Sequence, residues 1–369
     1  MKIAILHDNL NLCGGAEKLA LVTMNALRDS HITLVTSTKP DIDRIKMLTN
    51  EDVKIDDIIY TPLSFIPKTY RSIAVVLKKL DDRFDLVFNT NGDTIPFIHD
   101  DITYIHYPLP LKLYANNNAW EYNGILWDIY YAPVRIMHRL LAKRTNDNII
   151  LTNSNFTRGK IREVLGRDSI VVYPPVDTSI YKQALMYKYE LADNTDQILV
   201  ISRFTPDKNL ILIPELAKRL KARFVIIGTK GYGADNIIMT IKRRAEELGV
   251  SDKIILIPNA TNEIKFRELC RSKVYLHLKR YEHFGISIVE ALAAGCSAVT
   301  YNAGGPKEFV PDEYRYNSIE EVVDKLDYAL AKWDIKEAER SASIASRFDR
   351  TIYENKIKEI VRTINIKNV

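Results

Sequence analysis

The sequence predicts an α/β protein built from two parallel sheets, each covered by helices. Short apolar segments rich in β-branched residues alternate with longer segments of helical spacing, and this alternation occurs in both halves of the chain. Such alternation is typical of parallel sheets with helical crossovers. A length of 369 residues suits two domains, and a composition of 46% hydrophobic and 27% charged residues is ordinary for a globular protein.

The predicted strands are short and fall into two groups along the chain. In the first half they cover 2–7, 32–36, 86–89, 103–106 and 148–153; in the second half they cover 198–202, 224–228, 253–257, 274–278 and 298–301. The Gly-rich and charged motifs described below follow these strands directly. Since ligands in such folds bind beyond the carboxyl ends of parallel strands, the positions predict one cleft shared by both domains.

The boundary between the domains is expected after a rigid extended segment. Tyr173-Pro174-Pro175-Val176-Asp177 ends the first group of strands, and a polar stretch at 191–196 precedes the second group. We therefore expect a first domain at 1–185, a second at 186–345 and a terminal helical segment at 346–369.

The strongest functional signal is the segment from Glu282 to Gly295. It places Glu282 and Glu290 eight positions apart, with Gly285 between them and a helix that ends at Gly295. Free N–H groups at the start of that helix favour a phosphate, and the two carboxylates can accept hydrogen bonds from hydroxyls on either side. A diphosphate flanked by two polyols is a nucleotide sugar.

A pair of cations follows the first strand of the second half. Arg203 comes directly after that strand, and Lys208 lies in the turn that opens the next helix, where the helix dipole disfavours a cation. An anionic ligand would offset this cost. The alternative is a pair of solvated loop charges.

Two features of the first half are weaker signals on their own. Gly14-Gly15 follows the first strand and can let a sugar or phosphate approach the backbone, but a tight turn with Glu17 complementing the helix dipole explains it equally. No G-x-G-x-x-G pattern is present there. His106 ends a strand and is a candidate imidazole, with a structural histidine as the alternative and with His7 and His283 left open.

The motifs occur in an order that resembles the retaining glycosyltransferases of family 4, which have the two-domain GT-B fold. The matching segments span nearly the whole chain: Gly14-Gly15-Ala16-Glu17, Tyr173-Pro174-Pro175-Val176-Asp177, Arg203 with Lys208, Glu282 with Glu290, and Asn302-Ala303-Gly304-Gly305-Pro306-Lys307-Glu308. The amino-acid sequences of segments 104–108, 276–278 and 282–286 are most similar to those of mannosyltransferases that extend dolichol-linked oligosaccharides. At 277–280 the chain departs from a Pro-Ser pair common in the family, which leaves the donor sugar open.

The resemblance implies roles for individual residues. Arg203 and Lys208 would neutralise the departing diphosphate, Glu282 would contact the transferred sugar, and Glu290 would hold the ribose. The implied catalytic set is His106, Arg203, Lys208 and Glu282; the implied donor-binding set is Gly14, Gly15, Arg203, Lys208, Glu282, His283, Phe284, Gly285, Ile286 and Glu290. The first domain would hold the acceptor, and the terminal helix would cross back onto that domain.

The expected function is retaining transfer of a hexose, mannose from GDP-mannose, to a glycan or lipid-linked glycan. The alternatives are a UDP-sugar-dependent glycosyltransferase, a nucleotide-sugar epimerase and a catalytically silent sugar-nucleotide-binding protein. No metal is expected, because Asp41 and Asp43, which resemble an Asp-x-Asp metal motif, are explained by capping of a helix after Pro40.

Charge and apolar residues favour a lipid surface over nucleic acid as a partner. The net charge of +5 is modest, and no nucleic-acid reading motif accompanies it. Segments 62–71 and 75–79 mix aromatic, aliphatic and cationic residues, and a basic excess occurs across 135–167, although solvated helix faces would explain both. No run approaches about 18 apolar residues, and the three cysteines lack metal-ligand spacing. We expect a cytoplasmic protein that contacts the cytoplasmic face of a membrane.

Overall fold

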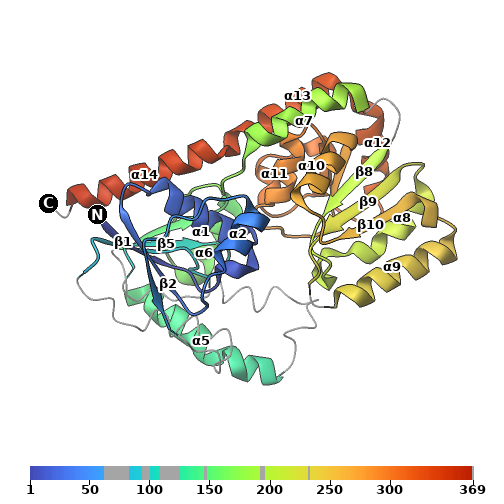
Figure 1. Ribbon diagram of the computed structural model, residues 1–369. Coiled ribbons are helices and arrows are strands. Elements are labelled where there is room, and N and C mark those ends of the chain that lie inside the picture. Colours follow the sequence, from blue (N-terminus) through green and yellow to red (C-terminus); the bar gives the residue numbers. More distant parts are fainter. Residues whose placement is uncertain are drawn as a thin grey trace. The chain divides into compact units, whose positions relative to one another are not determined.

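The computed structural model describes residues 1–61, 83–93, 100–108, 125–144, 148–191, 196–231 and 233–367 (Figure 1). The chain forms two compact units, Met1–Pro175 together with Thr351–Val369, and Val176–Arg350. The division after Pro175 lies before the expected boundary at 185, because helix α7 (Thr178–Leu191) packs against helices of the second unit. Val176 pairs with Asp349, so the chain enters and leaves the second unit at neighbouring points.

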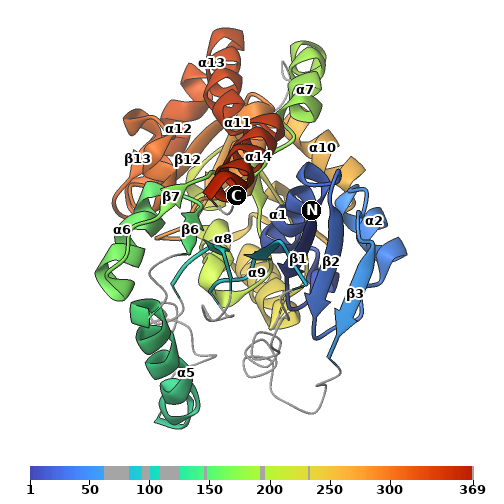
Figure 2. The same ribbon diagram turned by 90° about the vertical axis from the view of Figure 1, so that its left-hand side faces the viewer.

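The first unit is built on a seven-stranded sheet whose described pairings are all parallel, with the order β3-β2-β1-β4-β5-β6-β7. Its strands are β1 (Lys2–Leu6), β2 (His31–Thr36), β3 (Asp57–Tyr60), β4 (Leu86–Asn89), β5 (Ile102–Ile105), β6 (Ile149–Thr152) and β7 (Ile170–Val171). Its described helices include α1 (Gly15–Ala26), α2 (Ile42–Thr49), α5 (Ile125–Arg144), α6 (Asn155–Leu165) and α14 (Arg350–Lys367). Figure 2 shows β1, β2 and β3 side by side.

The core of the first unit follows the period-two alternation of its central strand. Ile3 and Ile5 of β1 pack in a cluster that includes α1 residues and Ile357 of α14, whereas Ala4 and Leu6 pack on the opposite face of the sheet. The hydroxyls of Thr23 in α1 and Tyr353 in α14 are hydrogen-bonded at 2.6 Å. The terminal helix is therefore part of the hydrophobic core of the first unit.

The second unit has a six-stranded parallel sheet with the order β10-β9-β8-β11-β12-β13. Its strands are β8 (Gln197–Ile201), β9 (Arg223–Gly228), β10 (Ile254–Pro258), β11 (Val274–His277), β12 (Ser297–Tyr301) and β13 (Arg315–Tyr316). Its α-helices are α7, α8 (Ile213–Arg219), α9 (Ala234–Leu248), α10 (Asn262–Arg271), α11 (Ile286–Ala293), α12 (Val322–Lys332) and α13 (Ile335–Ala345).

The two parallel, helix-covered sheets confirm the predicted α/β class, and every predicted strand has a counterpart within a residue or two. Strands β3, β7 and β13 were not predicted. All three lie at sheet edges, and β7 and β13 contain only two residues each. An edge strand this short has no apolar run that distinguishes it from a loop.

Parallel pairing gathers the residues that follow the strands at one edge of each sheet. In the first unit His7, Thr90 and His106 directly follow β1, β4 and β5. In the second unit the turn containing Arg203 follows β8, and the loop containing Glu282 follows β11. Each unit thus presents candidate site residues along the carboxyl edge of its sheet.

Candidate active site

The carboxylate of Glu282 is the centre of a charged cluster in the second unit. Lys208 Nζ lies 3.1 Å from Glu282 Oε2, and His277 Nε2 lies 3.1 Å from the same oxygen. The side chains of Lys208 and Glu282 are 13% and 16% exposed. His277 precedes Glu282 by only five residues, whereas Lys208 comes from a segment 74 residues earlier in the chain.

Electrostatics keep Glu282 ionised. Burial alone would raise its pKa, but the ammonium groups of Lys208 and Lys279 and the hydrogen bond from His277 hold the pKa well below its usual range. Burial lowers the pKa of His277, so this imidazole is neutral near pH 7 and donates its Nε2–H to the carboxylate. The site therefore holds an ionised acceptor that can take hydrogen bonds from ligand hydroxyls.

Further contacts bind the turn that carries the two predicted cations to the loop that carries Glu282. Lys279 Nζ lies 3.2 Å from Asp207 Oδ2, and Asn209 Nδ2 donates to the carbonyl of Leu278 at 3.2 Å. Asn209 has φ 54°, a conformation that asparagine tolerates. Arg203, at the start of the same turn, is exposed. Burial lowers the pKa of Lys279, but attraction to nearby carboxylates outweighs burial and raises this pKa above its usual value. The positive charge of Arg203 acts against that rise.

The loop after β12 packs against the Glu282 loop backbone to backbone. Gly305 N–H donates to the carbonyl of Glu282 at 2.8 Å. A Cβ on Gly304 would lie 2.3 Å from the Glu282 carbonyl oxygen, and one on Gly305 would lie 2.2 Å from the His283 carbonyl oxygen. Gly304 also has φ 81°. Only glycines fit here, so this pair sets the position of the site loop.

Helix α11 begins where the motif predicts. Gly285 has φ 96° and precedes the first helical residue, Ile286, and Gly295 has φ 79° just beyond the helix end. Both glycines have left-handed backbone geometry, and Gly295 ends the helix as the sequence predicts. The side chain of Phe284 is buried against Phe309 and Phe348, so its contribution to a ligand would come from its backbone.

Glu290 is buried on α11 with partners from two other helices. Its Oε1 accepts hydrogen bonds from Tyr181 Oη at 2.9 Å and Lys265 Nζ at 3.0 Å. These donors offset the cost of burying the carboxylate. Both contacts use Oε1, so a ribose diol would bind through Oε2.

The first unit holds the remaining predicted residues. His106 Nε2 lies 3.3 Å from the carbonyl oxygen of Thr90, which makes Nε2 the donor. Gly14 N–H donates to Glu17 Oε2 at 2.8 Å, and Gly15 begins α1. Both glycines are exposed, so the turn is accessible.

Sequence reasoning left three members of the charged cluster out of the site: Asp207, His277 and Lys279. His277 and Lys279 adjoin the carboxyl end of β11, close to Glu282, and Asp207 immediately precedes Lys208. That placement at a strand end was the available signal. The hydrogen-bond and ion-pair partners were not visible in the sequence.

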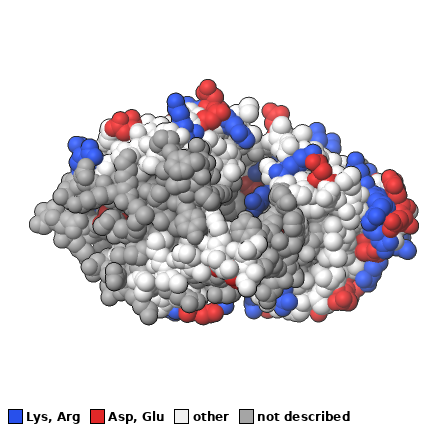
Figure 3. Space-filling view, turned by 90° about the horizontal axis from the view of Figure 1, so that it is seen from below, with Lys and Arg blue, Asp and Glu red and all other residues white. Residues whose placement is uncertain are grey.

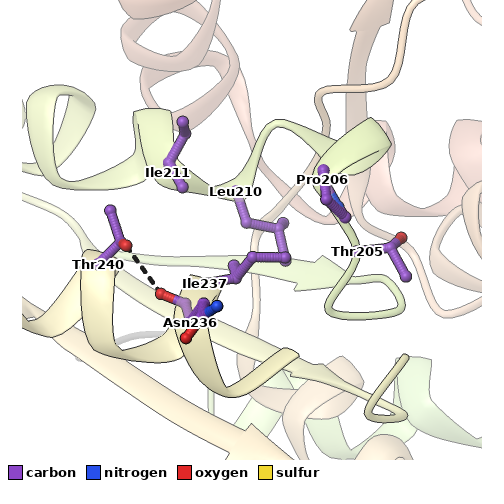
Figure 4. A pocket seen from close by; sticks show the side chains of 7 residues that line it. All are labelled: Thr205, Pro206, Leu210, Ile211, Asn236, Ile237 and Thr240. Carbon is purple, nitrogen blue, oxygen red and sulfur yellow. Dashed lines mark hydrogen bonds between the residues drawn. The ribbon is translucent and has the colours of Figure 1, made fainter. Parts of the chain in front are cut away.

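A small pocket adjoins the Arg203–Lys208 turn and has a volume of about 230 Å³ (Figure 4). Its lining comes from that turn, the following 3₁₀ segment and α9: Thr205, Pro206, Leu210, Ile211, Asn236, Ile237 and Thr240. No lining side chain is ionisable, so this pocket lacks the charge that a diphosphate requires.

The described residues contain no cluster of three or more His, Cys, Asp or Glu side chains arranged to hold a metal ion. Asp41 caps α2 by accepting a hydrogen bond from the Arg44 N–H at 3.1 Å, as expected for a capping residue. Asp43 lies in the first turn of the same helix.

Comparison with solved structures assigns the fold class. The whole chain matches sucrose-phosphate synthase from Thermosynechococcus elongatus with a TM-score of 0.77 at 12% identity, covering 100% of both chains. HepE from Anabaena, solved with UDP and glucose, matches with a TM-score of 0.73 at 15% identity over 98% of this chain and 100% of that chain. With its two parallel sheets, the protein has the GT-B fold.

Sequence comparison then defines the enzyme class. Residues 182–347 match the family model for glycosyl transferases group 1. A relative from Xenopus tropicalis, GDP-Man:Man(3)GlcNAc(2)-PP-Dol alpha-1,2-mannosyltransferase, is 23% identical over 89% of this chain and 79% of its own. The Homo sapiens protein of that name is 25% identical, covering 83% and 73%. Alpha-1,3/1,6-mannosyltransferase ALG2 of Saccharomyces cerevisiae is 23% identical, covering 84% and 71%. The protein is a glycosyltransferase.

Proposed function

We propose that this glycosyltransferase transfers mannose from GDP-mannose, with retention of configuration, to a lipid-linked glycan. The observation that carries the proposal is the ionised Glu282 carboxylate with Lys208 3.1 Å away, which combines a hydroxyl acceptor with a cation at the end of one sheet. The choice of mannose and of a lipid-linked acceptor is supported by the names of the relatives, which specify a GDP-Man donor and a PP-Dol acceptor.

The donor is held by cationic side chains at its diphosphate and by carboxylates at its sugar hydroxyls. Lys208 and Arg203 neutralise the diphosphate, Glu282 accepts hydroxyls of the mannose, and Glu290 accepts the ribose diol through Oε2. The backbone from His283 to Ile286 supplies N–H groups to the phosphates. Preorganised cations at the leaving group stabilise the negative charge that develops there, and such stabilisation accelerates group transfer because it acts most strongly in the transition state.

The reaction exchanges one bond for another at the anomeric carbon. The bond from C1 of mannose to the phosphate oxygen breaks as the acceptor hydroxyl oxygen bonds to C1 on the same face. The acceptor proton goes to the leaving phosphate, and the products are GDP and the mannoside. His106 approaches the donor sugar, and Gly14-Gly15 leaves room for a sugar or phosphate near the backbone.

A thermal-shift panel with GDP, UDP and ADP tests the donor site, because a ligand that binds only the folded state raises its apparent stability. We expect a GDP-selective rise that Arg203→Ala and Lys208→Ala both reduce. A UDP-selective rise would keep the glycosyltransferase and change the donor. Product analysis with GDP-mannose and a lipid-linked mannosyl acceptor then separates transfer from epimerisation, and nucleotide binding without turnover on any acceptor would indicate a silent binding protein.

We further propose that helix α5 contacts the cytoplasmic face of a membrane. None of the described helices is long and apolar enough to cross a bilayer. On α5, however, a series of large apolar side chains is more than half exposed: Ile125, Leu126, Ile129, Ile136 and Leu140. Such a face on a helix that also contains four basic residues at 135, 139, 143 and 144 suits an anionic lipid surface.

The excess of basic residues predicted across 135–167 contributes less to membrane contact. Arg158 and Arg162 both bind Asp168, and Lys160 binds Glu163. On the described part of the face in Figure 3, cationic and anionic side chains are interspersed. The expected apolar and basic segments at 62–71 and 75–79 lie outside the described residues.

Vesicle flotation tests the membrane proposal. Leu126→Ser combined with Ile129→Ser should release the protein from anionic vesicles, whereas Met239→Ser, which changes a similarly exposed apolar side chain on α9, should not. Equal binding by the double variant and the wild type would contradict a membrane role for α5.

A further inference from the structure

Tyr281 has a backbone conformation that aromatic residues rarely adopt. It lies in the turn between β11 and Glu282 and has φ 56°. Among the residues that the structure describes, five other than glycine have a positive φ, and three of these are asparagines, which tolerate the left-handed region. A bulky ring at such a position is strained, and asparagine or glycine would relieve the strain. Strain of this kind is concentrated at functional sites.

Other backbone segments of the second unit hold the turn in this conformation. The N–H of Gly305 donates to the carbonyl of Glu282, the next residue after Tyr281, at 2.8 Å. A Cβ on Gly304 would lie 3.1 Å from the carbonyl carbon of Tyr281, so the two backbones are in close contact. These contacts fix the backbone of the turn and with it the direction in which the Tyr281 side chain leaves the chain.

The Tyr281 side chain is 49% exposed, and a cation lies over one face of its ring. The guanidinium carbon of Arg280 is 4.9 Å from the centre of that ring and 6.0 Å from the centre of the Tyr301 ring. Tyr301 is in turn 4.3 Å from the ring of Tyr316, which is fully buried and donates its hydroxyl to the carbonyl at the end of β11. Two tyrosines thus support Arg280 from behind. Within the described part of the chain, Arg280 is the only cation over the Tyr281 ring, and no aromatic ring stacks on it.

The polar groups of this pair are available to a ligand. Among the described residues, neither the Tyr281 hydroxyl nor the Arg280 guanidinium has a hydrogen-bond or ion-pair partner, whereas the preceding Lys279 is paired with Asp207 at 3.2 Å. A pyranose ring presents an apolar C–H face bordered by hydroxyls. An exposed aromatic face flanked by hydrogen-bond donors is complementary to both features.

We propose that Tyr281 and Arg280 form a stacking site for a pyranose ring of a sugar substrate. The Tyr281 ring packs on the C–H face of the sugar, and the guanidinium donates hydrogen bonds to hydroxyls at its edge. This inference rests on the proposed function and refines it, because the next residue, Glu282, is the one that accepts mannose hydroxyls there. Stacking on Tyr281 orients a sugar ring beside that carboxylate. An anionic ligand would use the guanidinium but not the ring.

Calorimetric titration of the full chain tests the assignment with three probes: GDP, GDP-mannose and octyl α-D-mannoside. For Tyr281→Asn we expect unchanged GDP affinity and about three- to tenfold weaker binding of GDP-mannose or of the mannoside, the loss typical of an aromatic stacking contact. Weakened GDP-mannose would assign the ring to the donor sugar, and weakened mannoside would assign it to the acceptor. Tyr281→Phe keeps the ring and should retain most of the affinity.

Tyr328→Asn is the matched control. Tyr328 is 44% exposed, and Lys332 Nζ lies 5.5 Å from its ring centre, but it belongs to α12 and has ordinary helical geometry. This substitution should change the affinity for none of the three probes.

Unfolding by urea distinguishes ligand binding from packing. Because Tyr281→Asn relieves backbone strain, its unfolding midpoint should equal or exceed that of the wild type. A lower midpoint would assign Tyr281 to packing and overturn the proposal. Tyr281→Gly relieves the same strain, so it repeats the titrations if the asparagine variant folds poorly.

Two binding results would also overturn the proposal. Tyr281→Asn that matches the wild type with both sugar probes would exclude stacking. Arg280→Gln that weakens GDP instead of the sugar probes would identify an anion site. Absence of GDP binding by the wild type would instead count against the proposed function.

Discussion

Lys208 and Glu282, expected to bind different parts of one substrate, lie 3.1 Å apart and neutralise each other. His277 donates to the same Oε2, so this oxygen keeps a hydrogen-bond donor if Lys208 turns toward a phosphate. Under the proposed donor binding, the diphosphate would compete with Glu282 for Lys208, and the imidazole would limit the cost of that competition. This arrangement makes the charges of the site interdependent.

Removal of only one member of the Lys208 and Glu282 pair should destabilise the fold. Lys208→Met leaves a largely buried carboxylate without its main cation, and we expect a loss of about 1–3 kcal/mol in the free energy of unfolding by urea. Lys208→Met combined with Glu282→Gln should recover much of that loss while transfer activity stays abolished. Lys273→Met, which breaks an ion pair with the exposed Asp196, should cost less than about 1 kcal/mol. Additive losses in the double variant would contradict the coupling.

His277 should make the fold less stable in mild acid. Its pKa is lowered by burial, so the unfolded chain binds a proton more readily, and stability is lost as pH falls below about 6.5. We expect His277→Gln to reduce the difference in unfolding free energy between pH 7.5 and pH 5.5. The exposed His31, paired with Asp57, supplies the control His31→Gln. An unchanged pH dependence in His277→Gln would contradict a neutral, buried imidazole.

Protonation of Glu282 should also make the fold less stable as the pH falls, but in a lower pH range than protonation of His277. A carboxyl whose folded pKa is depressed stabilises the fold above its unfolded pKa, here near 4.5, and that contribution disappears as pH falls through the folded value. The stability difference between wild type and Glu282→Gln should therefore shrink below about pH 4.5. Glu282→Gln should also retain GDP affinity while transfer falls. Intact transfer would show that Glu282 does not contact the sugar in the way proposed.

The glycine pair after β12 should tolerate no side chain. Gly305→Ala places a Cβ against the His283 carbonyl, and Gly304→Ala adds the strain of φ 81°, so both should lower stability by more than about 1 kcal/mol and impair donor binding. Gly159→Ala is the matched control, because a Cβ on this α6 residue meets nothing within 4 Å. That change should be neutral or stabilise by about 0.5–1 kcal/mol.

Variants of Glu290 and of its partner Tyr181 distinguish a structural role of Glu290 from a ligand-binding role. Glu290→Ala should weaken GDP and GDP-mannose alike by about 1–3 kcal/mol if its free oxygen holds the ribose. Tyr181→Phe removes one donor to Oε1 without touching Oε2, so it should cost stability but leave GDP affinity nearly unchanged. Equal GDP affinity in Glu290→Ala and wild type would restrict Glu290 to its contacts with Tyr181 and Lys265.

Local patterns in the sequence predicted much of the fold. The β-branched runs identified the central strands, and the glycines at 285 and 295 marked where α11 begins and ends, because backbone conformations with positive φ favour glycine. The edge strands β3, β7 and β13 escaped prediction because pairing with a neighbour, rather than local composition, makes them strands.

The site residues likewise fall into those that were predicted from the sequence and those that only the structure revealed. Glu282, Glu290, Arg203 and Lys208 were found from motif spacing, whereas His277, Lys279 and Asp207 became visible only through their contacts. The domain boundary lies after Pro175 rather than after residue 185, because α7 buries its apolar face in the second unit. The sequence thus determined which residue types follow each strand. Only the tertiary structure decided which of them meet, because contacts between distant segments depend on strand order and helix packing, which no local pattern encodes.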